Sequence, residues 1–415
     1  MNWAGVSMAG LLLATFLPFA AGAADWPQFL GPTRDAVYSG SPLADEWPAE
    51  GPPIVWRSAV GEGYASPVAS EGRLIICHRV GAQLLVSCYD MLTGKTNWVS
   101  KFPMQFRDGE NRDSGPRPTP AINGDKVFVC NTDGFLVCLD LNRGTTIWSH
   151  QTKKEFNSTA TWHGFAASPL VTERTVIVPV GGTNSSGIVA FDRVAGNVVW
   201  KSLNEKATAS SPVLAAIDGK PGLFVITRTA IHSLDPETGN DYWKLPTRKQ
   251  STGDLYAASP IVFGNYLFVS GCYRLGAELF QIESGQPKKL WHLDDSLNTH
   301  FANAIHDSGF LYGFHGHAGL PEGRNFRCIE VATGKVLWEE ALAGSGTVLR
   351  AGSNLVILLE TGEIELVKAT PKGLQVLSRA QVVGRPVRTY PAIVDGYAFI
   401  KGPNSLVCLD LRKRK

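Results

Sequence analysis

The chain has 415 residues, a length that allows a large buried core in one or more domains. Only 18% of the residues are charged and the formal net charge is +2, so no strong field favours nucleic acid or an anionic membrane as a partner. Glycine (43 residues) and proline (25 residues) are abundant, which is typical of many short strands joined by turns.

The N-terminal segment has the pattern of a secretory signal peptide. An apolar run, LLLATFLPFA, is followed by small residues in AGAAD and is too short to span a membrane comfortably. We expect cleavage after Ala23, so that residues 1–23 are the signal peptide; no Lys or Arg precedes the run, and an uncleaved anchor is the alternative. The first cysteine is Cys77, so no cysteine that could carry a lipid anchor lies near this site. The sequence predicts a periplasmic or secreted protein without a transmembrane span in the mature chain.

After a leader segment at residues 24–53, one motif recurs along the chain. An acidic residue is followed by a glycine four positions later and by a tryptophan four positions after that, as in Asp90, Gly94 and Trp98. The motif recurs from Asp140, Asp192, Asp235 and Glu330, gains two residues before Trp291, and has Leu377 in place of tryptophan after Gly373. Glycine supplies the left-handed turn conformation at no steric cost. We expect the acidic side chain to accept hydrogen bonds from the turn backbone.

Each motif belongs to a unit of four predicted short strands. A unit opens with a small residue and a proline, its fourth strand contains the tryptophan, and the units recur at a period of about 40–50 residues. Eight starts are found, near Pro67, Pro120, Pro169, Pro212, Pro260, Ala304, Val348 and Pro391. We predict an all-β fold, a single eight-bladed β-propeller of four-stranded blades at residues 54–411, followed by a basic tail at residues 412–415.

The eighth unit contains only three strands, because the chain stops in SLVCLDLRKRK. The segment IVWRSAV, Ile54–Val60, precedes the first unit and matches VVWKSLN, which starts at Val198. We expect this N-terminal strand to complete blade eight and close the ring, which removes an open strand edge. The large, flat tryptophans are expected to fill the gaps between neighbouring blades; these docking residues are Trp56, Trp98, Trp148, Trp200, Trp243, Trp291 and Trp338.

Seven cysteines are spread through the repeat, four of them (Cys88, Cys138, Cys328 and Cys408) at one equivalent position. Across their hairpins, Cys77 could face Cys88 and Cys130 could face Cys138. Cross-strand disulfides are therefore one interpretation for an exported protein. The other is that the thiols are buried as small apolar residues, and the sequence alone does not fix the pairing.

In a propeller, the segment that enters the first strand of each blade lies beside the central channel, so equivalent positions can be compared. Three residues before each start stand Tyr64, Arg117, Ala166, Ala209, Ala257, Phe301, Ser345 and Arg388. Blades eight, one and two are neighbours, so Arg388, Tyr64 and Arg117 should cluster at the channel mouth. Nearby loops add Trp162, His163, Tyr256 and His300. This set could bind a carboxylate or an extended peptide; the alternative is that they are ordinary loop residues whose arginines bond neighbouring carbonyls.

No catalytic residue and no metal site are predicted. The sequence contains neither a Gly-rich phosphate loop nor a nucleophile elbow. The segment HGH, from His315 to His317, could present two imidazoles to a metal, but no third ligand is evident. The acidic residues of the repeat are explained by the turns and are not counted as calcium ligands.

The recurring LDxxTGxxxW pattern resembles the pyrroloquinoline quinone (PQQ)-type propeller repeat, whose blades are WD40-like, and it covers Ile54 to Leu411. The leader DWPQFLGPTRD, from Asp25, and the segment LYGFHGHAG resemble exported bacterial proteins of this class. Such proteins are similar to BamB, the propeller lipoprotein of the outer-membrane β-barrel assembly machine. The resemblance implies a non-catalytic scaffold that binds a protein, peptide or polymer partner in the cell envelope. This sequence departs from that lipoprotein because it lacks the lipid-anchor cysteine.

The same repeat implies a second possibility, a PQQ-dependent quinoprotein dehydrogenase that oxidises an alcohol or a sugar. Those enzymes hold the quinone near the ring axis beside a calcium ion, and many place two adjacent cysteines over it. This sequence has no Cys-Cys pair and is short for the extra loops that build that pocket. We expect no cofactor, with PQQ and calcium as the alternative.

Overall fold

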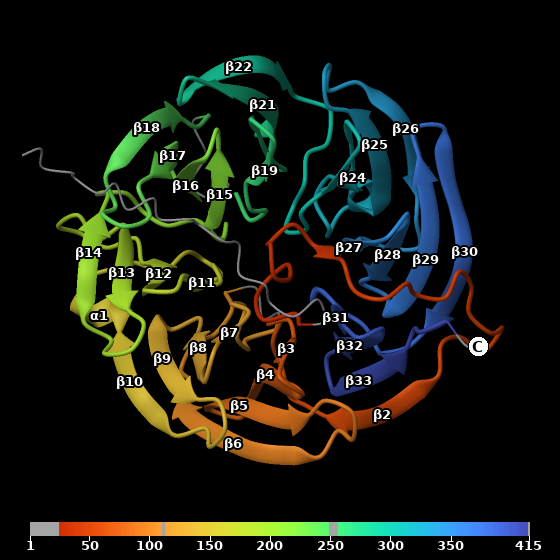
Figure 1. The fold of residues 1–415 in the computed structure, drawn as a ribbon, viewed down its shortest axis with the longest axis horizontal. Helices are drawn as coiled ribbons and strands as arrows, with labels where there is room; N and C mark the ends of the chain where they lie inside the picture. The colour runs from red at the N-terminus through yellow and green to blue at the C-terminus, as the bar shows by residue number, and fades with distance from the viewer. Residues whose placement is uncertain (1–24, 110–112, 249–255, 414–415) are drawn as a thin grey trace, which may run out of the picture.

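The computed structural model describes residues 25–109, 113–248 and 256–413. In this part of the chain, eight β-sheets surround a common axis as the blades of a propeller (Figure 1). The predicted all-β, eight-bladed propeller is confirmed. The expected signal peptide at residues 1–23 and the end of the basic tail lie outside the described residues. No described helix is both long and apolar enough to cross a membrane.

Within each blade the strands are antiparallel and follow one another from the axis outward (Figure 1). Blades one to four contain β3 (Val68–Ser70), β4 (Arg73–Val80), β5 (Gln83–Asp90) and β6 (Thr96–Pro103); β7 (Ala121–Asn123), β8 (Lys126–Cys130), β9 (Phe135–Asp140) and β10 (Thr146–Gln151); β11 (Leu170–Val171), β12 (Thr175–Pro179), β13 (Ile188–Asp192) and β14 (Val198–Ser202); and β15 (Val213–Ile217), β16 (Lys220–Ile226), β17 (Ala230–Leu234) and β18 (Asp241–Pro246).

Blades five to eight contain β19 (Ile261–Phe263), β20 (Tyr266–Gly271), β21 (Gly276–Glu283) and β22 (Gln286–Leu293); β23 (Ile305–Asp307), β24 (Phe310–His315), β25 (Asn325–Glu330) and β26 (Val336–Ala341); β27 (Gly346–Ala351), β28 (Asn354–Leu359), β29 (Glu363–Thr370) and β30 (Gly373–Gln381); and β31 (Ala392–Val394), β32 (Tyr397–Lys401), β33 (Ser405–Asp410) and β2 (Ile54–Ala59). Two one-turn helices, α1 (Thr152–Glu155) and η1 (Pro321–Arg324), lie in connections between strands.

The turn of the repeat is built as its residues predict. Asp90 Oδ1 accepts a hydrogen bond from the Thr93 backbone N–H at 2.8 Å, and Asp140 Oδ1 accepts one from the backbone N–H of Arg143 at 2.8 Å. Gly94 has a φ of 68°, in the left-handed region that favours glycine. A Cβ at Gly94 would lie 2.6 Å from the Trp56 ring, so this glycine also makes room for the tryptophan of the preceding blade.

The repeat tryptophans connect neighbouring blades. The Nε1–H of Trp56 donates to the Met91 carbonyl at 2.9 Å, and that of Trp98 donates to the Leu141 carbonyl at 2.9 Å. Trp148, Trp200, Trp291 and Trp338 make the corresponding bond to a carbonyl of the following blade. Each of these six rings therefore combines apolar contact with a satisfied polar group. Trp243 packs in one apolar cluster with Leu267 and Val269 of the following blade.

The ring is closed by the N-terminal strand. β2 pairs antiparallel with β33, and Trp56 stands opposite Cys408. This is the register in which Trp98 stands opposite Cys88 in blade one. The prediction that Ile54–Val60 supplies the missing fourth strand of blade eight is confirmed, with strand pairing over Ile54–Ala59.

A belt of hydrogen bonds surrounds the channel at the residue just before each start position. The backbone N–H of each belt residue donates to a side-chain oxygen of the next one. The order is Ser66 to Thr119 (3.0 Å), Thr119 to Ser168 (3.0 Å), Ser168 to Ser211 (2.9 Å), Ser211 to Ser259 (3.2 Å), Ser259 to Asn303 (2.9 Å), Asn303 to Tyr390 (2.6 Å) and Tyr390 to Ser66 (2.9 Å). The long Tyr390 side chain skips blade seven, where the Thr347 hydroxyl donates instead to the Thr389 carbonyl at 3.0 Å. The belt ties seven blades together at their innermost point.

The leader segment docks at the axis, in the centre of the ring (Figure 1). Trp26 forms a two-way backbone bridge with Ala69 of blade one, and the Pro27 carbonyl accepts a bond from the Ile122 backbone N–H of blade two. β1 (Val37–Tyr38) pairs in parallel with β27 of blade seven. The buried Arg34 guanidinium donates to the carbonyls of Pro169 and Pro212, in blades three and four. The leader thus contacts these five blades, and its Ala44 backbone N–H also donates to the Leu411 carbonyl, which follows the last strand of blade eight.

The cysteine pairs considered from the sequence are not opposite one another. In the β4–β5 hairpin, Cys77 stands opposite Val86 and Cys88 opposite Ile75. In the β8–β9 hairpin, Cys130 stands opposite Leu136 and Cys138 opposite Phe128. The registers therefore offset each pair by two residues, and no disulfide joins any of the seven cysteines, all of which are buried. Burial raises the pKa of the Cys138 thiol to about 12, as expected for a thiol in an apolar core.

Candidate functional site

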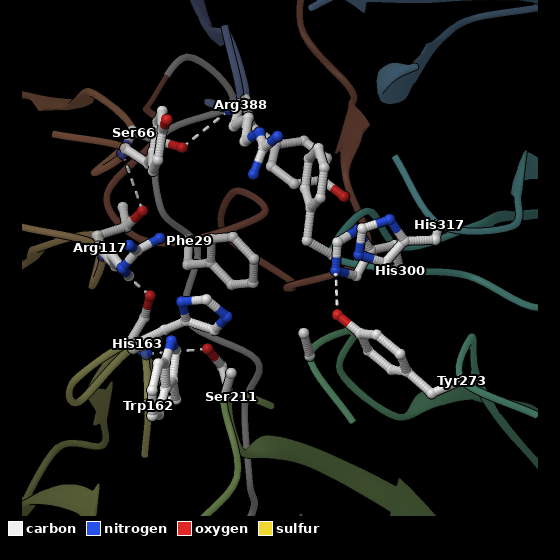
Figure 2. A pocket seen from close by; sticks show the side chains of 18 of the residues that line it. Phe29, Ser66, Arg117, Trp162, His163, Ser211, Tyr273, His300, His317 and Arg388 are labelled. Carbon is white, nitrogen blue, oxygen red and sulfur yellow. Dashed lines mark hydrogen bonds between the residues drawn. The ribbon is translucent and has the colours of Figure 1, made fainter. Parts of the chain in front are cut away.

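A pocket of about 660 Å³ lies on the propeller axis and is lined by residues of the inner loops (Figure 2). Its wall contains seven of the eight positions compared in the sequence: Tyr64, Arg117, Ala166, Ala209, Ala257, Phe301 and Arg388. These residues stand two positions before the belt, and side chains two apart on an extended segment point the same way. The comparison of equivalent positions in the repeat therefore identified residues that line one pocket in the structure.

Arg388, Tyr64 and Arg117 form the cluster predicted for the mouth. The Arg117 guanidinium carbon lies 5.4 Å from the centre of the Tyr64 ring, and that of Arg388 lies 5.5 Å from it. Arg388 also lies 5.7 Å from the centre of the Phe301 ring. These are cation–π distances, so the aromatic rings help to orient both guanidinium groups.

Each arginine of the cluster is also held by a carboxylate that is not among the lining residues. Arg117 Nη2 lies 2.5 Å from Asp108 Oδ2, a side chain that is fully buried, and Arg388 Nη2 lies 2.8 Å from Glu360 Oε1. The expected alternative, in which the arginines bond neighbouring carbonyls, holds for one contact, from Arg117 to the Asp113 carbonyl at 3.3 Å. Burial lowers the pKa of Arg117, and burial raises the pKa of Tyr64 against the opposing effect of Arg388.

Aromatic rings and imidazoles form the rest of the wall and the rim. Trp162 is 67% exposed at the mouth, and neighbouring His163 lies 3.2 Å from Asp108 through Nδ1. Opposite them, His300 and His317 are stacked with ring centres 4.3 Å apart. The Tyr273 hydroxyl is 2.9 Å from His300 Nε2 (Figure 2). The pocket wall therefore combines guanidinium groups with aromatic rings and imidazoles, and the stacked His300 and His317 lie opposite Trp162.

The inner end of the pocket is closed by the belt and the leader. Ser66, Thr119, Ser168, Ser211 and Tyr390 of the belt line it, together with Phe29 of the leader. Phe29 packs edge-on against Tyr390 with ring centres 5.5 Å apart. Figure 2 shows Phe29 in the middle of the circle of lining side chains. The channel is thereby converted into a pocket with a base.

Of the seven predicted binding residues, six line the pocket and one does not. Tyr256 is only 2% exposed and packs in the apolar cluster of Ile226, Trp243 and Phe280. Because Ala257 points into the channel, the residue next to it in an extended segment points away. The placement of Tyr256 at the mouth was wrong for this reason.

Several lining residues were not predicted as binding residues. Phe29 comes from the leader, which carries no repeat, and Arg228 and Tyr273 come from hairpin loops between the second and third strands of their blades. Tyr273 has a φ of 57° in a tight turn, a conformation that no sequence pattern marked. The belt was visible in the sequence as a small polar residue before the proline, but its hydrogen bonding was not recognised.

The HGH segment does not form a metal pair, because its two imidazoles diverge. His315 is buried against Arg327 and accepts the Asn298 backbone N–H, whereas His317 stacks on His300. Burial lowers the pKa of His315 to about 4. Among the described residues no group of three His, Cys, Asp or Glu side chains could hold a metal ion.

The pocket also does not fit calcium beside a quinone. Calcium takes six to eight oxygen ligands, with carboxylates prominent among them. The described lining residues include no Asp or Glu, and the nearby Asp108 and Glu360 carboxylates are paired with arginines behind the wall. The donor set offered to a ligand is cationic and aromatic.

The fold and this pocket define a PQQ-like, eight-bladed β-propeller with an axial cavity. The chain belongs to the family described as outer membrane protein assembly factor BamB, whose model matches residues 82–340. A protein of that name from Burkholderia pseudomallei is 25% identical over 328 residues, or 74% of each chain. Quinohemoprotein alcohol dehydrogenase ADH IIB from Pseudomonas putida is 30% identical over 128 residues, which are 30% of this chain and 16% of that enzyme.

Solved structures of both kinds share the fold. The crystal structure of BamB from Moraxella catarrhalis has a TM-score of 0.63 at 17% identity, covering 88% of this chain and 98% of that one. Quinohemoprotein alcohol dehydrogenase from Comamonas testosteroni has a TM-score of 0.67 at 13% identity, covering 94% and 81%. At these identities the similarity concerns the fold alone.

Proposed function

We propose that this protein is a non-catalytic, exported propeller scaffold that binds a protein or peptide partner in the cell envelope at the mouth of the axial pocket. Membership of the BamB family supports a role in outer-membrane protein assembly. The observation that carries the proposal is the placement of Tyr64 between Arg117 and Arg388, facing an aromatic wall. Arginine and aromatic side chains are the residue types that dominate binding energy at protein interfaces.

The test is capture of partners from the native envelope by crosslinking to purified protein. The variant Arg117→Ala with Arg388→Ala should reduce capture of specific polypeptides by at least tenfold. The matched control is Arg193→Ala, because Arg193 lies outside the pocket and bonds Asn123 and the Glu173 carbonyl. Equal capture by both variants, with melting temperatures unchanged, would remove the pocket from the proposal.

The second hypothesis, a PQQ-dependent dehydrogenase, has the similarity of fold in its favour and the lining of the pocket against it. Purified protein is mixed with PQQ and calcium, and the absorbance of bound quinone and alcohol- or sugar-dependent dye reduction are measured. Stoichiometric quinone with turnover would replace the scaffold proposal. We expect neither signal above that of a protein-free control.

A further inference from the structure

We propose that the axial pocket binds the free C-terminal carboxylate of an extended polypeptide. This inference rests on the proposed function, since it specifies which part of a partner enters the pocket. It is carried by three observations: the charge of the lining, the hydrogen-bond donors of the inner end, and the closure of that end.

The lining contains guanidinium groups and no carboxylate among its described residues. Three arginines, Arg117, Arg228 and Arg388, are among the described lining residues, and none of those residues is Asp or Glu. The carboxylates that hold Arg117 and Arg388 engage only part of each guanidinium. Arg117 Nε is buried without a hydrogen-bond partner, and the Nη1 group of neither arginine bonds another described residue. Guanidinium groups with unused donors match a carboxylate, which accepts such bonds in pairs.

The inner end of the pocket presents hydroxyl donors. The hydroxyl oxygens of Ser66, Thr119, Ser168 and Ser211 each accept a backbone N–H from the neighbouring blade. A hydroxyl that accepts one bond still has its own O–H to donate. None of these four hydroxyls donates to another described residue, and all four line the pocket. The belt that joins the blades therefore also leaves four hydroxyl donors in the pocket for a ligand that accepts hydrogen bonds, and a carboxylate is such a ligand.

Because the inner end of the pocket is closed, only a terminus of a polypeptide can enter it. Tyr390 and Phe29 lie across the axis, so an extended polypeptide cannot pass through the ring and must enter by one terminus. A protonated N-terminus has no acceptor for the guanidinium donors of Arg117 and Arg388, whereas a C-terminus brings a carboxylate that accepts from these arginines and from the hydroxyls. A cavity of about 660 Å³ lies within the range of sites that take drug-sized ligands, which corresponds to the last few residues of a peptide.

The aromatic side of the pocket suits the side chains that precede the carboxylate. Phe301 and the stacked His300 and His317 rings stand on one side, and the exposed Trp162 stands at the rim. Alanines at positions 166, 209 and 257 leave the intervening wall open. Apolar or aromatic side chains near the C-terminus can therefore be buried while the carboxylate reaches the inner donors.

The test uses the full-length mature protein and two synthetic peptide libraries with the last four positions randomised. One library ends in a free carboxylate, and the other ends in an amide. Peptides retained by immobilised protein are counted by mass spectrometry. We expect the acid forms to be enriched at least tenfold over the amides, because a charge-assisted bond contributes about 1.5–3 kcal/mol, which is roughly tenfold to a hundredfold in affinity. Equal retention of both libraries, or retention of neither, would overturn the proposal.

Variants then test whether the peptides bind in the pocket. The comparison of acid with amide peptides does not depend on any variant. Arg388→Gln should abolish the preference for acid peptides, while Arg193→Gln, outside the pocket, should keep it; circular dichroism and melting confirm folding. PQQ, a small tricarboxylate, is titrated in parallel, and binding of PQQ without peptide binding would overturn the peptide assignment. Capture of envelope partners that persists when acid and amide peptides behave alike would contradict this inference and leave the proposed function standing. Failure of the wild-type protein to capture any envelope polypeptide would contradict both this inference and the proposed function.

Discussion

Closure of the ring by β2 gives a quantitative prediction about stability. Trp56 lies with its ring centre 6.3 Å from that of Tyr89 in blade one and 6.1 Å from that of Phe399 in blade eight. Its Nε1–H bonds the Met91 carbonyl. Trp56→Ala removes these contacts at the joint between blades eight and one.

The expected loss is about 3 kcal/mol, the lower end of the range for tryptophan-to-alanine changes, because Trp56 is only partly buried. With an unfolding entropy of about 2.1 cal/mol/K per residue over roughly 390 residues, this lowers the melting temperature by about 4 °C. Among the described contacts, removing residues 412–415 deletes the exposed Lys413 pair with Asp45, the Arg412 pair with Asp410 and the cation–π contact of Arg412 with Tyr397. Exposed ion pairs contribute little, so this truncation should cost much less than Trp56→Ala.

The assay is calorimetry of the wild type, Trp56→Ala and the tail truncation, with Trp98→Ala as a matched change inside the ring. Trp98 makes the equivalent bond to the Leu141 carbonyl, so its loss should be of similar size. A Trp56→Ala shift no larger than that of the tail truncation would refute the argument that β2 holds the ring closed.

Three further predictions concern the belt, the leader and acid stability. Tyr390→Phe leaves the buried Asn303 backbone N–H without its acceptor and should cost about 1–3 kcal/mol in urea unfolding; no change would show that the belt does not contribute there. Arg34→Ala removes two donors to blade carbonyls and should make the leader cleavable in limited proteolysis while the blades stay protected; an equally protected leader would contradict its anchoring. Burial lowers the pKa of His78 and of His315 to about 4, so protons bind the unfolded state first and stability should fall as the pH drops from about 6.5 to 4, by up to about 3 kcal/mol per histidine. Burial raises the pKa of Glu365 to about 7 and so contributes the opposite change over this range. The histidine part is therefore the difference between the wild type and His78→Gln with His315→Gln, and a pH dependence unchanged by these substitutions would contradict the burial of these rings.

The repeat made the fold predictable from the sequence, because a recurrent turn and tryptophan define one blade and their number defines the ring. The same repeat aligned Tyr64, Arg117 and Arg388 at equivalent positions, and those positions form the wall of the pocket. Ring closure was also predictable, since Ile54–Val60 matches the fourth strand of another blade. Each of these predictions came from comparing equivalent positions in different blades.

The residues that were missed lie outside that comparison. Phe29 reaches the pocket only because the leader folds back onto the axis, and no repeat position predicts such docking. Tyr390 closes the belt because its side chain is long enough to reach Asn303 across blade seven. That reach depends on the distance between blades, which the repeat pattern does not give. Tyr256 points away from the pocket because successive side chains alternate in direction along the extended segment before the first strand of blade five. The disulfides considered for Cys77 with Cys88 and for Cys130 with Cys138 do not form, because the hairpin register offsets the two cysteines of each pair by two residues.

The central claim is that a polypeptide partner enters the axial pocket. A photo-crosslinking amino acid is placed at Ala209, on the open wall of the pocket, and separately at Val194, which is 57% exposed on the β13–β14 turn. In native envelope extracts, the Ala209 probe should crosslink to a polypeptide within its last few residues, and the Val194 probe should not. Crosslinks that arise only from Val194, or that fall in the interior of the partner chain, would contradict the account.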